Sequence, residues 1–358
     1  MFSNFFLKSF RIVLLPLALV YWAVIAVRNF LYDQRILRSA QFGLPLICVG
    51  NLSVGGTGKS PMVEYLVTLL KKDFRIATLS RGYKRKTRGY ALANEETTAL
   101  EIGDEPMLFH LKFPEIPVAV GEERMDAIPQ LLHDRPDLNA VILDDAFQHR
   151  AITAGFNILL TEYHNLFTRD FYLPTGDLRD QRSSRKRADV IVVTKCDPGL
   201  SPGSREKIIR ELNPGPDQRV FFTTIVYDQP YQIIDRSAGQ LGPDVEVLLV
   251  TGIANPAPLK KFVEERSRTY FLQQYPDHHI FTIDDLREIK RKFDQLSSTR
   301  KIVLTTEKDA VRLHKFDREL LGFPLYVIPV RHDFLFEEGS AFNEQIIEFI
   351  RNFPKTPA

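Results

Sequence analysis

Short apolar runs alternate with longer polar or helical stretches along most of this chain. Between Leu44 and about Val226, the runs have the length of β-strands and the stretches between them can hold helices. Such an alternation indicates a mainly parallel sheet covered by helices on both faces. The expected strands are Leu44–Val49, Phe74–Leu79, Ala140–Leu143, Asn157–Leu160, Val190–Thr194 and Val220–Ile225. The expected fold class is therefore α/β, with a three-layer α/β/α domain at residues 39–226.

A second, smaller α/β domain is expected after a linker. Residues 227–240 begin with a polar passage that contains proline, and we interpret them as this linker. Thr282 and Asp285 have the spacing of a capping box, which predicts a helix start. The other expected elements are strands at Val245–Thr251, His279–Thr282, Lys301–Leu304 and Leu325–Val330 and a helix at Phe342–Asn352. The second domain is therefore placed at residues 241–358.

An uncharged apolar run, Ile12 to Val27, dominates the N-terminal part of the chain, residues 1–38. It is shorter than the roughly 20 residues that span a bilayer. Basic residues flank it and would each add about 1 kcal/mol of attraction to anionic lipid near the surface. They are Lys8, Arg11, Arg28, Arg35 and Arg38. The pattern favours an apolar helix in the membrane interface; a spanning helix and a buried core helix remain alternatives.

Composition changes this picture little. The 358 residues are 44% hydrophobic and 26% charged, which is typical of a globular chain with full cores. The two cysteines, Cys48 and Cys196, each end an expected strand and indicate a reducing compartment without a disulfide framework. The formal net charge is +2, and no nucleic-acid recognition module is found, so no nucleic-acid partner is expected.

A glycine-rich loop follows the first expected strand and closes with Gly58-Lys59-Ser60 at the start of a helix. Backbone N–H groups of such a loop cradle phosphate oxygens, and the helix N-terminus adds positive potential. Lys59 would reach the β- and γ-phosphates, and the Ser60 hydroxyl would bind Mg²⁺. The expected nucleotide-binding residues are Ser53, Val54, Gly55, Gly56, Thr57, Gly58, Lys59 and Ser60. Ser53 stands where the usual pattern has glycine.

Two further features support a phosphate-handling site. Asp144 and Asp145 end an apolar strand, where either carboxylate can hold Mg²⁺. Arg81 and Arg179 open two basic runs that follow segments expected near the nucleotide. Such arginines neutralise charge during phosphoryl transfer or grip a phosphate on the acceptor. The alternative is that the basic runs are solvated loops.

Together these motifs resemble one family, the tetraacyldisaccharide 4′-kinases of lipid A synthesis. The resemblance covers nearly the whole chain, beginning with the basic, apolar N-terminal helix and ending with TTEKDAVR at Thr305–Arg312. Between them lie GNLSVGGTGKSP, SRGYKRK, GDEP (Gly103–Pro106), VGEER (Val120–Arg124), LDDAFQHR (Leu143–Arg150), LPTGDLRD (Leu173–Asp180), TGIANP (Thr251–Pro256) and PDHH (Pro276–His279). The family usually has Gly, Glu and Thr where this chain has Ala146, Asp180 and Ser60.

The resemblance implies a reaction. ATP, with Mg²⁺, would phosphorylate the 4′-hydroxyl of an acylated glucosamine disaccharide 1-phosphate, giving lipid IVA. Asp104 resembles the catalytic carboxylate that draws the proton from this hydroxyl, and His278 resembles its partner; the residues alone do not distinguish His278 from His279. The implied setting is a monomer at the cytoplasmic face of the bacterial inner membrane.

Two rival functions remain. One is a membrane-associated P-loop switch or partitioning ATPase, which the GTPase-like sequence TKCD at Thr194–Asp197 would suit. A preference for GTP would favour it. The other is a non-catalytic membrane scaffold with a vestigial loop, which failure to bind Mg-ATP would favour.

Overall fold

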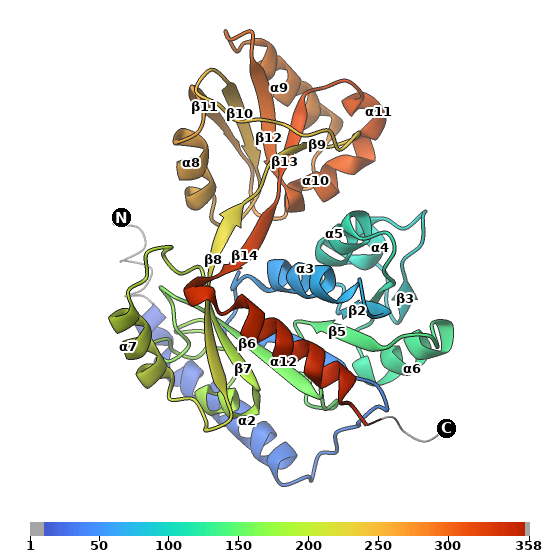
Figure 1. The fold of residues 1–358 in the computed structure, drawn as a ribbon, viewed down its shortest axis with the longest axis vertical. Helices are drawn as coiled ribbons and strands as arrows, with labels where there is room; N and C mark the ends of the chain where they lie inside the picture. Colours follow the sequence, from blue (N-terminus) through green and yellow to red (C-terminus); the bar gives the residue numbers. More distant parts are fainter. Residues whose placement is uncertain (1–10, 355–358) are drawn as a thin grey trace.

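The larger of two sheets has nine strands, in the order β14-β8-β7-β6-β1-β5-β2-β4-β3 (Figure 1). The computed structural model describes residues 11–354, so the predicted flank Lys8 lies outside the described residues. The strands are β1 (Leu46–Asn51), β2 (Ile76–Ser80), β3 (Ala91–Leu92), β4 (Val118–Val120), β5 (Ala140–Asp144), β6 (Phe156–Glu162), β7 (Val190–Thr194), β8 (Arg219–Tyr227) and β14 (Val330–Phe334). All neighbours pair in parallel except β3 with β4 and β14 with β8 at the two edges.

Helices cover both faces of this sheet, as predicted. On β1, Leu46 and Cys48 face the core under α6 and α7, whereas Ile47 and Val49 face the core under α3, α5 and α12. This alternation follows from the two-residue period of a strand. The helices are α3 (Lys59–Leu70), α4 (Ala99–Ile102), α5 (Asp104–Lys112), α6 (Arg124–Asp134), α7 (Pro202–Leu212), α12 (Gly339–Arg351) and the 3₁₀ turns η2 (Arg182–Arg187) and η4 (Leu335–Glu337).

The second sheet has five strands, in the order β11-β10-β12-β13-β9. They are β9 (Tyr231–Gln232), β10 (Glu246–Thr251), β11 (Thr269–Gln274), β12 (Lys301–Thr306) and β13 (Leu325–Ile328). Around them lie α8 (Ala257–Glu264), α9 (Ile283–Asp294), α10 (Glu307–Leu313), η3 (His314–Phe316) and α11 (Asp317–Leu320). The predicted capping box at Thr282 is confirmed at the start of α9.

The predicted extent of the second domain, 241–358, is wrong at both ends. After β13 the chain returns to the first domain, where β14 pairs with β8 and α12 buries Phe342, Ile346 and Ile350 in the core beside α3. At the other end, β9 lies within the predicted linker and pairs with β13. The predicted strand Leu325–Val330 is two strands, separated at Pro329. Proline lacks an N–H for a sheet ladder, which suits this crossing point.

One predicted strand is absent from the second domain. Residues His279–Thr282 lead into the capping box of α9, and the strand in this region is instead β11. Its residues are largely exposed at the sheet edge, so its sequence lacks the buried alternation that predicts a strand.

The N-terminal helix is α2 (Leu15–Asp33), preceded by the turn η1 (Ile12–Leu14). Only Ala18 and Asn29 are buried on α2, which contradicts the core-helix alternative. By length and composition alone, α2 is long and apolar enough to cross a membrane.

Candidate active site

Residues 53–60 comprise the glycine-rich loop that follows β1 and the first two residues of α3. Gly58 has a φ of +86°, a left-handed conformation that glycine adopts readily, and it caps α3. Asn51, at the end of β1, donates from Nδ2 to Thr57 Oγ1 at 2.9 Å, and the Val54 N–H donates to the Asp177 carbonyl at 2.7 Å. These contacts support the loop beside the helix N-terminus, the position from which such loops bind phosphate.

Three charged side chains meet beside this loop. Lys59 Nζ lies 3.8 Å from Asp145 Oδ1, and Arg179 Nη1 donates to Asp145 Oδ2 at 3.1 Å. Arg179 also donates to Asn51 Oδ1. Burial opposes the charge of Asp145, but Lys59 and Arg179 outweigh it and lower the pKa of the carboxyl. Burial lowers the pKa of Lys59, and Asp145 partly offsets this. The structure therefore brings Lys59, Asp145 and Arg179 together as one group.

Asp144 differs from its neighbour. Its Oδ2 accepts from Ser80 Oγ at 3.3 Å, whereas buried Oδ1 has no hydrogen-bond partner among the described residues. Burial, and then the charge of Asp145, raises the pKa of Asp144 to about 6. A buried carboxylate oxygen without a donor is a suitable ligand for Mg²⁺. Asp144 therefore fits the metal better than Asp145, whose oxygens face Lys59 and Arg179.

Arg81 lies directly after β2 and is exposed. Its charge acts on Arg124 and His149, whose pKa values fall mainly because of burial. Arg124 in turn donates from Nη2 to the Asp144 carbonyl at 3.3 Å. Arg81 is thus near the strand end that holds the carboxylates.

A second group forms where the two domains meet. His278 Nδ1 lies 3.1 Å from Asp104 Oδ2. Arg312, on α10, donates to the same oxygen from Nε at 2.9 Å and from Nη2 at 2.7 Å. Burial would raise the pKa of Asp104, but Arg312 and His278 outweigh burial and lower it. Asp104 is therefore held as a carboxylate, with the recorded contacts on Oδ2.

The two neighbouring histidines have different surroundings. His279 Nε2 lies 2.9 Å from Asp285 Oδ2, and its ring stacks on Tyr275. His278 has a φ of +62°, which is uncommon for a residue other than glycine. Such backbone conformations cluster at functional sites. The geometry thus favours His278 as the partner of Asp104.

Helices α5 and α10 bring the two groups near each other. Lys308 Nζ lies 3.0 Å from Glu105 Oε1 across the domain boundary. The charge of Glu105 acts on Asp144, and that of Lys308 acts on Lys59. On the same side, Lys112 pairs with Glu64 of α3 at 2.5 Å and with Glu307 of α10 at 2.6 Å.

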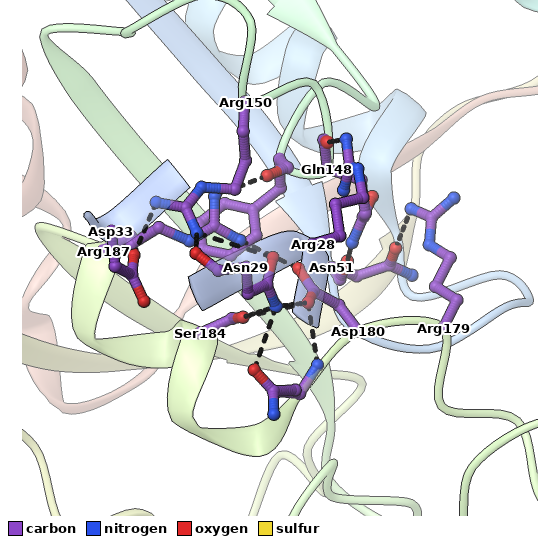
Figure 2. A network of polar contacts seen from close by, with 12 residues as sticks. Arg28, Asn29, Asp33, Asn51, Gln148, Arg150, Arg179, Asp180, Ser184 and Arg187 are labelled. Carbon is purple, nitrogen blue, oxygen red and sulfur yellow. Dashed lines mark hydrogen bonds and ion pairs between the residues drawn. The ribbon is translucent and has the colours of Figure 1, made fainter. Parts of the chain in front are cut away.

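Helix α2 is attached to the segment that carries Arg179 (Figure 2). Asn29 Nδ2 donates to Asp180 Oδ1 at 2.8 Å, and Tyr21 Oη donates to the Arg179 carbonyl at 3.2 Å. Asp180 also accepts from Ser184 Oγ at 2.9 Å and Arg187 Nη2 at 2.8 Å. A buried network of this kind fixes the position of the helix relative to Arg179.

Asn29, Asn51 and Arg312 were not singled out from the sequence. Asn51 lies in GNLSVGGTGKSP and Arg312 in TTEKDAVR, and Asn29 is the second residue after the apolar run. An asparagine at the end of a buried strand and an arginine within a charged helix start are weak signals alone. In the structure, Asn51 donates to Thr57 of the phosphate loop and Arg312 donates to Asp104.

Comparison with known proteins gives consistent similarities. A family model described as tetraacyldisaccharide-1-P 4′-kinase matches residues 10–351. A tetraacyldisaccharide 4′-kinase from Bacteroides thetaiotaomicron is 42% identical over 352 residues, covering 94% of this chain and 93% of the relative. One from Flavobacterium johnsoniae is 43% identical over 343 residues, covering 95% and 97%.

The fold is also similar to a solved structure. A crystal structure of LpxK from Aquifex aeolicus, described as in complex with ATP, has a TM-score of 0.74 and 27% sequence identity. The similarity covers 95% of this chain and 99% of that one. These similarities do not favour the alternative of a switch or partitioning ATPase.

Proposed function

Because the chain belongs to the tetraacyldisaccharide-1-P 4′-kinase family, we propose that it transfers the γ-phosphate of ATP to the 4′-hydroxyl of an acylated glucosamine disaccharide 1-phosphate, giving lipid IVA. The observation that carries the proposal is a phosphate loop near a carboxylate–imidazole pair that joins the two domains, with Asp104 from the first domain and His278 from the second. Lys59 belongs to the phosphate loop. One group suits a triphosphate, and the other suits a hydroxyl that must lose its proton.

The nucleotide side follows from residues 53–60. Their N–H groups and Lys59 bind the β- and γ-phosphates, and Arg179 and Arg81 stabilise charge that develops on the transferred group. Asp144 and Ser60 would hold Mg²⁺, which when bound would neutralise charge on the phosphate oxygens. In this structure Arg179 contacts both oxygens of Asp145. To reach the phosphate, Arg179 would give up part of this contact.

The acceptor side follows from Asp104. A sugar hydroxyl becomes a competent nucleophile as a base takes its proton during attack. Arg312 and His278 contact Oδ2, so Oδ1 can accept that proton. His278 helps to orient the carboxylate and to move the proton onward. All the named groups come from one chain, so we propose that the monomer is sufficient for activity.

Incubation with ATP, Mg²⁺ and a lipid A disaccharide 1-phosphate tests the proposal. We expect the mass of the lipid to increase by one phosphoryl group, and the 4′-position to carry it. Release of free phosphate without a modified lipid would instead indicate an ATPase.

We further propose that α2 attaches the protein to the cytoplasmic face of the bacterial inner membrane. Its support is the exposed apolar stripe formed by Leu17, Val20, Val24 and Val27, which are 58–62% exposed. Burying this stripe among acyl chains removes apolar surface from water. An acylated acceptor would then lie beside the Arg179 segment, which α2 contacts.

Polar substitution of the stripe is expected to separate membrane binding from nucleotide binding. A variant with Leu17, Val20 and Val24 replaced by asparagine should remain largely in the supernatant when sedimented with anionic vesicles. Its affinity for Mg-ATP should be unchanged, because the stripe points away from the buried contacts of Asn29.

The matched control is Asn29→Leu. It keeps the apolar stripe but removes a donor from buried Asp180, at a cost of about 1–3 kcal/mol. This variant should still sediment with vesicles while its turnover falls. The membrane proposal is wrong if the three-asparagine variant sediments as the native protein does.

A further inference from the structure

His332, on β14, contacts the phosphate loop from outside the nucleotide site. Its Nε2 lies 2.9 Å from the Gly58 carbonyl oxygen, and its Nδ1 lies 2.9 Å from Thr223 Oγ1 on β8. A carbonyl oxygen only accepts, so Nε2 carries the hydrogen. In the neutral ring Nδ1 is then the acceptor, and the Thr223 hydroxyl donates to it. Burial lowers the pKa of His332 to about 4, so the ring is neutral at physiological pH.

The Gly58 carbonyl is a sensitive place for this contact. It also accepts the Met62 N–H at 3.2 Å, the first hydrogen bond of α3. Two donors on one oxygen fix the plane of the Gly58–Lys59 peptide, and this plane sets the direction of the Lys59 N–H. Glycine at +86° has a broad choice of conformations, so the peptide would otherwise be free to turn. The neighbouring Thr57 carbonyl is held in the same way by Thr194 Oγ1 at 2.8 Å.

The position of His332 in the chain also links the phosphate loop to the junction between the two domains. The chain leaves the first domain after β8 and returns to it as β14, and the two strands lie side by side where the domains join (Figure 1). His332 opposes Ile225 in this pair, and Thr223 is its diagonal neighbour. A rotation of the strand pair would therefore move the ring that holds Gly58.

We propose that His332 is a positioning residue for the nucleotide: through its Nε2–H, the strand pair β8–β14 fixes the Gly58 peptide and aims the Lys59 N–H at phosphate. This inference rests on nucleotide binding at the phosphate loop, as proposed above. His332 itself does not contact the reacting atoms.

Two polar substitutions of His332 separate its contact with Gly58 from its contact with Thr223. The amide of His332→Gln reaches the place of Nε2 and can still donate to Gly58. The shorter amide of His332→Asn reaches the place of Nδ1 and keeps only the Thr223 contact. We expect the Gln variant to bind Mg-ATP with nearly native affinity and the Asn variant to bind it roughly fivefold or more weakly. Without nucleotide, the Met62 amide should exchange hydrogen faster in the Asn variant than in the Gln variant.

Thr223→Val provides a further test that leaves His332 in place. It removes the donor that fixes the tautomer, so a loss of affinity in the same direction but smaller is expected. Equal affinities and equal Met62 exchange in the Gln and Asn variants would overturn the proposal, as would native behaviour of both Asn and Val variants. If the native protein binds no ATP, the nucleotide site itself is misassigned, and Met62 exchange still decides whether His332 holds the loop.

Discussion

Replacement of Lys59 by alanine is expected to reduce phosphoryl transfer by several orders of magnitude while leaving the fold intact. Phosphoryl transfer depends mainly on positioning and on neutralising charge, and we propose that Lys59 supplies both at the β- and γ-phosphates. Most of the loss should therefore be in kcat. The measurement is the rate of lipid phosphorylation at saturating Mg-ATP, with circular dichroism to verify folding.

The matched control is Lys72→Ala, which removes an exposed lysine just beyond the other end of the same helix. It should have native turnover. A folded Lys59→Ala variant with near-native turnover would show that the loop does not hold the transferred phosphate in the proposed way.

Asp104→Ala and His278→Ala are each expected to lower the rate by roughly 10²–10⁴, the usual range for general acid–base catalysis. If the two side chains act as one unit, the double variant should be little slower than the slower single variant. Losses that multiply would instead mean separate roles. His279→Ala is the internal control, because His279 contacts Asp285 rather than Asp104.

The pH dependence of kcat/KM should show how Arg312 affects the pKa of Asp104. Arg312 and His278 hold the pKa of Asp104 below its usual value, so the carboxylate stays ionised down to acidic pH. Removing the guanidinium in Arg312→Gln raises this pKa. A base works only when deprotonated, so activity should then be lost at a higher pH on acidification. If the acidic limb of the kcat/KM profile were unchanged in this variant, Arg312 would not set the pKa of the catalytic base.

Local patterns predicted the parts of the site that are contiguous in sequence. The phosphate loop follows from a strand, a turn and a helix in order, and the carboxylates at the end of β5 follow from the apolar strand before them. The three-layer fold follows from the alternation of apolar runs. The contacts of Asn29, Arg312 and His332 could not be predicted in this way. Each joins segments far apart in the chain, so it depends on the final packing of helices and strands rather than on local preference.

The prediction of the domain boundary was wrong for a related reason. The apolar run 325–330 resembles one strand, yet the residues before Pro329 join the second sheet and the residue after it joins the first. Composition carries no information about which sheet a strand joins. The register of β14 on β8 decides this, and His332 takes its place opposite Ile225 as a result.

The return of the chain to its first sheet also has a consequence for biosynthesis. A ribosome makes β14 and α12 after all the strands of the second sheet, because they follow those strands in the chain. Until then the larger sheet lacks an edge strand, α3 lacks the packing of α12 beside it and the Gly58 carbonyl lacks its imidazole donor. A nascent or prematurely terminated chain therefore has an unfinished nucleotide site. Asp104, His278 and Arg312 all precede β14 in the chain, so the acceptor-side residues have already been synthesised when β14 brings His332 to the phosphate loop.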